Sequence, residues 1–102
     1  MTNKELFNKL IDLERERQNK KFPNQQKQKD VSLYQWATIL GEEYGEFLKE
    51  VNDHENLKAI IELAETAAVC LRISEVFFSN EVLKEAFDIM NKRTQNQKAK
   101  EQ

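Results

Sequence analysis

Two groups of glutamates stand in apolar, helix-periodic stretches near the middle of this 102-residue sequence. The first group is Glu42, Glu43 and Glu46, and the second is Glu62 and Glu65. An isolated ionised carboxylate is costly to bury, so such groups usually pair with cations or hold a metal ion. A ligand set made only of oxygen atoms suits Mg²⁺, or Mn²⁺, better than zinc. The sequence therefore predicts a divalent-metal site.

The first glutamate group lies on a helix that is predicted to begin near residues 30 to 32. Ser32 and Gln35 have the spacing of a capping box at this point. Beyond it, apolar side chains share one broad helical face while the glutamates share another. Glu43 lies closest to the apolar margin, where a carboxylate can be partly dry and still reach inward. The apolar face consists of Leu33, Trp36, Ala37, Leu40, Tyr44, Phe47, Leu48 and Val51.

The second group lies on a helix predicted from about residue 56 to residue 78. This helix is apolar on nearly every side from Ala67 onward, which predicts a central position or a subunit interface. The connection over residues 51 to 55 is short, and a short connection between two long helices favours an antiparallel hairpin. Such a hairpin places the two glutamate groups opposite each other. The facing pairs are Glu43 with Glu46 and Glu62 with Glu65.

Two outer helices complete an all-α prediction, because the chain has only two glycines and one proline and no strand-like alternation. The first is expected over residues 3 to 20 and is followed by a polar loop over residues 23 to 30. The last is expected over residues 81 to 93, where Ser79 can cap it. Residues 1 to 93 are therefore predicted to form a single helical domain. Residues 94 to 102 are predicted to form a polar C-terminal tail that frays.

Composition limits the classes of function. Charged residues make up 33% of the chain but the net charge is only −2, which does not suggest a protein that coats nucleic acid or a membrane. The polar N-terminus lacks a signal-peptide core, and residues 60 to 78 carry too much charge for a membrane span. A cytoplasmic location is expected. Cys70, the only cysteine, stands in an apolar run and is predicted to be a buried, inert thiol.

The order of these motifs resembles that of a known family. Residues 40 to 47 read LGEEYGEF, and residues 62 to 65 read ELAE. These segments resemble the EExGE helix and the ExxD pair of the MazG-like all-α nucleoside triphosphate pyrophosphohydrolases. Upstream, residues 15 to 22 and the segment from Trp36 to Leu40 are similar to small MazG-like proteins that are common in phages and Gram-positive bacteria. The resemblance covers residues 10 to 78.

The resemblance implies a four-helix core that assembles into a homodimer or homotetramer. It also implies a specific reaction. The expected reaction is Mg²⁺-dependent cleavage of a nucleotide between the α- and β-phosphates, which yields a monophosphate and pyrophosphate. Glu42 would act as an auxiliary ligand or position the attacking water. The residues that match the family's metal ligands are Glu43, Glu46, Glu62 and Glu65.

Residues outside the glutamate groups could bind the nucleotide. Arg15, Arg17 or Lys21, at the end of the first helix, could clamp the distal phosphates. Trp36 or Tyr34 could stack on the base. Two plainer interpretations stay open, in which the arginines pair with neighbouring glutamates along the helix and the tryptophan is a core residue.

One position departs from the family pattern and leaves rival functions open. Glu65 stands where the family has aspartate, and the extra methylene shifts the carboxylate by one bond length. Mg²⁺ demands near-ideal octahedral coordination, so this change would loosen the metal site. The first rival is a non-catalytic protein that sequesters a nucleotide on the same fold. The second is a helical interaction module without a ligand. Arg72 is expected to form an ion pair between subunits.

Overall fold

The computed structural model describes residues 1 to 21 and 31 to 101, and every regular element in these ranges is an α-helix. The all-α class predicted from the sequence is confirmed. The polar loop predicted over residues 23 to 30 lies outside the described residues. No described helix is both long and apolar enough to cross a membrane. The helices are α1 (Asn3–Lys21), α3 (Leu33–Asn52), α4 (Asn56–Phe77) and α5 (Asn80–Glu101).

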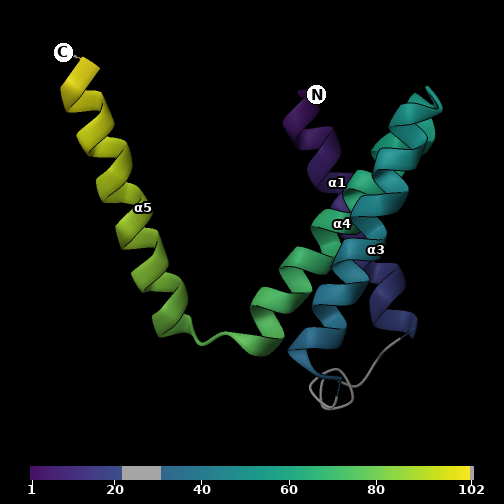
Figure 1. The fold of residues 1–102 in the computed structure, drawn as a ribbon, viewed down its shortest axis with the longest axis horizontal. Coiled ribbons are helices and arrows are strands. Elements are labelled where there is room, and N and C mark those ends of the chain that lie inside the picture. The colour runs from purple at the N-terminus through teal and green to yellow at the C-terminus, as the bar shows by residue number, and fades with distance from the viewer. Residues whose placement is uncertain (22–30, 102) are drawn as a thin grey trace.

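The hairpin of α3 and α4 is built by local hydrogen bonds at both ends of α3. At its start the Ser32 hydroxyl accepts from the Gln35 amide N–H at 3.2 Å, and the Gln35 side chain accepts from the Ser32 N–H at 2.8 Å. At its end His54 adopts a left-handed conformation with φ 59° and donates its N–H to the Val51 carbonyl at 3.1 Å. The chain reverses there, so α4 runs antiparallel to α3 as predicted (Figure 1).

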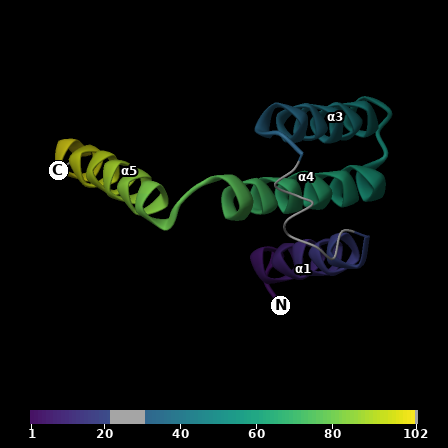
Figure 2. The ribbon, with the colours of Figure 1, turned by 90° about the horizontal axis from the view of Figure 1, so that it is seen from below.

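The core lies where α4 passes between α1 and α3, which form the outer helices of a three-helix layer (Figure 2). Ile11 of α1 packs against Ala64 and Ala68 of α4, and Ala68 is 0% exposed. Alanine side chains on α4 let the backbone of α1 approach closely, which excludes water from a small interface. The central position predicted for the third helix is confirmed. We call α1, α3 and α4 together the three-helix body.

Helix α5 is different, because it packs against none of the other described helices (Figure 1). The Ser79 hydroxyl accepts the Val82 N–H at 3.2 Å and so caps its first turn, as predicted. The predicted end at Arg93, with a frayed tail, is wrong, since α5 continues to Glu101. The last residues include Gln, Lys and Ala, which favour helix without needing an apolar stripe.

The prediction of a buried Cys70 is also wrong. Its neighbour Val69 is buried, but Cys70 itself is exposed on α4. Consecutive residues on a helix point about 100° apart. The outer helices α1 and α3 cover only part of the circumference of α4, and Cys70 falls on the uncovered part. An apolar run is therefore not buried all round in this chain.

Candidate metal site

Three carboxylates converge where the facing turns of α3 and α4 meet. Glu43 comes from α3, while Glu62 and Glu65 come from adjacent turns of α4. One oxygen of each carboxylate lies within 4.8 Å of the corresponding oxygens of the other two. All three residues are half-buried. The antiparallel hairpin predicted from the short connection is what brings them together.

The cluster is half-buried and strongly anionic. Burial raises the pKa of Glu43, Glu62 and Glu65 above the ordinary carboxyl range, and repulsion among the three adds to this effect. Glu14 of α1 adds further repulsion at Glu43 and Glu65. A cation at the centre would relieve both the desolvation and the repulsion.

The spacing of the three oxygens fits a small divalent cation. Neighbouring ligand oxygens around an octahedral Mg²⁺ are about 2.9 Å apart and opposite ones about 4.1 Å, given bonds of 2.0–2.1 Å. The observed separations of up to 4.8 Å are wider by less than an ångström. Rotation about the glutamate side-chain bonds covers that difference. The chemistry of the donor set, carboxylate oxygens only, also suits Mg²⁺ or Mn²⁺.

The other two glutamates of the first group lie outside this cluster. Glu42 and Glu46 are exposed on α3. Glu46 is nonetheless close enough to raise the pKa of Glu62 by repulsion. The structure therefore brings together three of the four residues that match the family's metal ligands.

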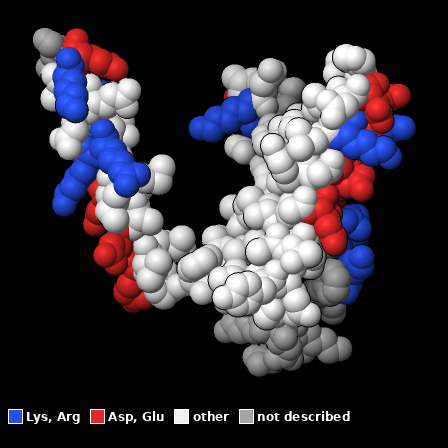
Figure 3. All heavy atoms as spheres, viewed as in Figure 1, with Lys and Arg blue, Asp and Glu red and all other residues white. Residues whose placement is uncertain are grey.

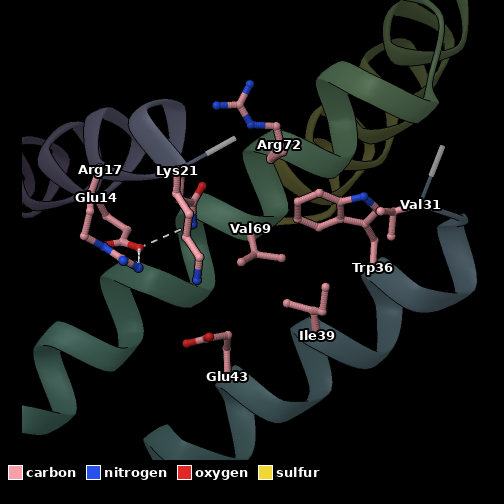
Figure 4. Close-up of a pocket in the computed structure, with 10 residues that line it drawn as sticks. Glu14, Arg17, Lys21, Val31, Trp36, Ile39, Glu43, Val69 and Arg72 are labelled. Carbon is pink, nitrogen blue, oxygen red and sulfur yellow. Dashed lines mark hydrogen bonds and ion pairs between the residues drawn. The ribbon is translucent and has the colours of Figure 1, made fainter. Parts of the chain in front are cut away.

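A cavity of about 290 Å³ adjoins the cluster, and Glu43 belongs to both. Figure 4 shows that side chains from α1, α3 and α4 turn toward it. Trp36 is 8% exposed and forms an apolar wall with Ile39 and Val69. Tyr34, the other predicted base platform, is exposed and does not line the cavity. The full lining is Glu14, Arg17, Gln18, Lys21, Val31, Trp36, Ile39, Glu43, Val69 and Arg72.

Two of the three cations proposed to clamp phosphates, Arg17 and Lys21, line this cavity. The Arg17 guanidinium pairs with both Glu14 oxygens, at 2.9 and 2.6 Å, so the predicted helix-neighbour pairing occurs beside the cavity. Glu14 raises the pKa of Arg17, and the charges of Glu65 and Glu43 add to this rise. Arg17 therefore lies within the field of the carboxylate cluster.

Arg15 points elsewhere, because residues two apart on a helix do not face the same way. It forms an ion pair with Glu75 of α4 and does not line the cavity. Arg72 lines the cavity, although it had been expected at a subunit interface. It is 5% exposed and donates a hydrogen bond to Asn19 of α1 within the same chain.

Gln18 is one of the cavity residues that the sequence analysis did not identify. Its side-chain N–H group donates to Glu14 at 3.4 Å, which turns its carbonyl oxygen away from that carboxylate. This oxygen is buried and has no hydrogen-bond partner among the described residues. A buried acceptor without a donor is costly, so it marks a place where a ligand N–H or a water would be stabilised. The signal in the sequence is its position four residues after Glu14, on the same helix face.

Comparison with known proteins gives no match. No family model matches the sequence, and no curated protein or solved structure is significantly similar to it. Membership of the MazG-like family therefore stays a prediction from the motifs. The geometry of the cluster and of its cavity is the basis for a function.

Proposed function

We propose that this chain is a Mg²⁺-dependent nucleotide pyrophosphohydrolase, which cleaves nucleoside or deoxynucleoside triphosphates to a monophosphate and pyrophosphate. The observation that carries the proposal is the convergence of Glu43, Glu62 and Glu65 beside a cavity lined by Trp36, Arg17 and Lys21. The resemblance of the two acidic motifs to the MazG-like family supports the same reaction.

The chemistry requires such a cluster to act through cations. A polyphosphate chain is strongly anionic and is repelled by bare carboxylates. Bound Mg²⁺ would supply charge neutralisation and a water of lowered pKa. The carboxylates of α3 and α4 would hold the cations in one place. The site thereby orients the phosphates relative to the bond to be cleaved.

The cavity supports a nucleotide as the ligand. Trp36 offers an aromatic wall of the kind on which a base packs. Arg17 and Lys21 line the same cavity, and their positive charges would attract the anionic phosphates. The unpartnered oxygen of Gln18 offers an acceptor for a ring or exocyclic N–H group. These features are our reason for proposing a nucleotide, and not inorganic phosphate alone, as the ligand.

A second candidate is a protein on the same fold that binds a nucleotide without cleaving it. Two observations favour it. Glu65 replaces the family's aspartate, and Glu42, the residue matched to positioning of the water, is exposed outside the cluster. Such a protein would lower the free concentration of its ligand.

Release of pyrophosphate from a panel of triphosphates, with Mg²⁺ or Mn²⁺, separates the two candidates. An enzyme releases pyrophosphate, and Glu43→Gln lowers kcat/KM by at least about 100-fold because a ligand to the metal is lost. The matched control is Glu55→Gln, which removes the same charge from an exposed residue before α4 and leaves the rate unchanged.

Nucleotide binding measured on the same samples gives the contrary outcome. Tight binding without turnover, unchanged by Glu43→Gln, would favour the sequestering protein. Absence of both binding and turnover across the panel would reject both candidates. The family resemblance also leads us to propose a homodimer or homotetramer, for which light scattering is the direct test.

A further inference from the structure

Helix α5 carries an apolar face that no other described helix covers. None of its 22 residues is buried, and Phe87 is 67% exposed. At about 100° per residue, Leu83, Phe87 and Met90 share one face, to which Val82 and Ala86 also belong. In Figure 3 the acidic side chains of its first half gather on the side turned away from the three-helix body. The acidic side chains opposite the apolar face are Glu81, Glu85 and Asp88.

The chain exposes more surface than a stable monomer of its size. A folded monomer of 12.1 kDa has about 6,000 Å² of accessible surface, and this chain has 8239 Å², about 2,200 Å² more. Its radius of gyration is 16.5 Å, compared with about 13 Å for a compact chain of this length. Obligate homodimers bury about 1,000–2,500 Å² on each subunit. The excess surface is therefore of the size that one such interface removes.

The three-helix body offers an apolar groove of matching size. It has a volume of about 480 Å³ and lies between the first half of α1 and the first half of α4. Its α1 side, from Asn3 to Leu10, rises about 10 Å, and the apolar stretch of α5 from Val82 to Met90 rises about 12 Å. The apolar lining is Leu6, Phe7, Leu10, Ile60 and Leu63.

The α5 helix of the same chain cannot fill this groove with its apolar stretch. Ile60 and Leu63 lie about 21–26 Å from the end of α4 at Phe77. If α5 folded back along α4, Met90 would reach only about 15 Å from the junction. Only the polar second half of α5 would then meet the groove. The apolar stretch fits the groove when it comes from another molecule.

We propose that two copies of this chain form a dimer by exchanging α5, so that the apolar face of each α5 lies in the α1–α4 groove of the other copy. The contact is made twice, once by each copy, and it buries the apolar surface of both α5 and the groove. This interface stands independently of the proposed nucleotide chemistry, which resides on the other side of α4 between α3 and α1.

Disulfide trapping tests the exchange directly. Both chains carry Cys70→Ser. One tagged chain carries Leu6→Cys, and a second chain, with another tag, carries Leu83→Cys, Phe87→Cys or Met90→Cys. The two chains are co-expressed and oxidised. An exchanged α5 gives a covalent heterodimer as the main product for at least one of the three positions, because the Cα atoms must come within 4.4–6.8 Å. The matched control, Asp88→Cys on the opposite face of α5, gives none.

Three results would overturn the exchange. The first is absence of a heterodimer at all three positions. The second is a covalent homodimer of the α5 variant alone, formed as readily as the heterodimer, which means that α5 pairs with α5. The third is a monomer with an internal disulfide when both cysteines are placed on one chain, which means that α5 folds back.

Sedimentation equilibrium supplies a second test that needs no disulfide. Phe87→Glu places a charge in the apolar face and weakens dimerisation by at least about 30-fold, as for an aromatic anchor of an interface. Ala99→Glu adds the same charge in the polar half of α5 and leaves the dissociation constant within about threefold. Helical circular dichroism that matches the parent chain shows that both variants fold. Equal dissociation constants for the two variants, or a parent chain that is monomeric at 100 μM, contradict the proposal.

Discussion

Helices α4 and α5 have the same length, 22 residues each, and opposite surroundings. Five residues of α4 are buried, whereas none of α5 is. Both sequences favour helix locally, so helix formation does not explain the difference. The buried residues of α4 lie between α1 and α3, while α5 packs against none of the other described helices. Secondary structure in this molecule follows from local sequence, and burial follows from which partner is present.

The two helices also use their glutamates differently. On α4, Glu62 and Glu65 are drawn into a half-dry cluster with Glu43 of α3. On α5, Glu81 and Glu85 remain in solvent opposite the apolar face. Among the described residues, glutamates gather into a cluster where a second helix packs beside them. Matched substitutions on α4 and α5 therefore test whether the two helices differ in packing and in charge.

The largest contrast is expected from an acid placed in each helix. Ala68→Asp puts a charge at a position of α4 that is 0% exposed, and we expect it to lower the free energy of unfolding by about 3–5 kcal/mol. Ala99→Asp changes the exposed end of α5 and is expected to cost less than about 0.5 kcal/mol. Urea unfolding followed by circular dichroism measures both values. Comparable losses in the two variants would mean that α5 is as tightly packed as α4.

Most of the helix boundaries could be predicted because they depend on neighbouring residues. Ser32 with Gln35 predicted the start of α3, and the short connection before α4 predicted the hairpin. The end of α5 was missed because the prediction relied on an apolar stripe, which a helix rich in Lys, Gln and Ala does not need. The exposure of Cys70 was missed because an apolar run does not say which side a neighbouring helix covers. Packing partners are a tertiary property, and periodicity does not contain them.

The candidate site was also predictable only in part. Convergence of Glu43 with Glu62 and Glu65 followed from the antiparallel hairpin. The sequence could not separate Arg17 from Arg15, since only the rotation of α1 against α4 decides which of them turns toward the cavity. The unpartnered oxygen of Gln18 could not be predicted from the sequence, because it becomes a binding feature only when the folded structure buries it.

The next largest effect concerns the metal. Millimolar Mg²⁺ at 100 times its Kd is expected to stabilise the folded chain by about 2.7 kcal/mol. Glu65→Gln on α4 should abolish this gain, because a charged ligand is lost from a cluster of three. Glu85→Gln on α5 should retain it. Calorimetric melting with and without MgCl₂ checks both variants, and an unchanged Mg²⁺ shift in Glu65→Gln would exclude this cluster as the binding site.

A smaller change is expected when the glutamate is shortened. Glu65→Asp restores the residue of the family motif and withdraws the carboxylate by one bond length. If the longer side chain loosens octahedral coordination, we expect Mg²⁺ affinity to rise by several-fold, on the order of 1 kcal/mol. Isothermal titration with MgCl₂ measures the affinity. A fall in affinity would mean that the backbone of α4 is spaced for glutamate and that the aspartate of the motif does not fit here.

The smallest effect is a pH dependence of the metal-free protein. Burial and mutual repulsion raise the pKa of Glu43, Glu62 and Glu65, so the folded state binds more protons than the unfolded state above the ordinary glutamate pKa of about 4.3. The stability that this protonation contributes is present at low pH. It is lost as the pH rises through the raised values. Melting of the EDTA-treated chain should therefore shift to lower temperature across this window.

Variants on the two helices locate the source of that shift. Glu43→Gln removes one charge from the cluster, relieves the repulsion on the other two carboxylates and should flatten the pH dependence. Glu85→Gln on α5 should leave the slope unchanged, because that residue is exposed and distant from the cluster. Mg²⁺ competes with protons for the same oxygens, so it should also flatten the slope in the parent chain. A slope that persists in Glu43→Gln, or that Mg²⁺ does not alter, would place the titrating groups elsewhere and remove the distinction between the glutamates of α4 and those of α5.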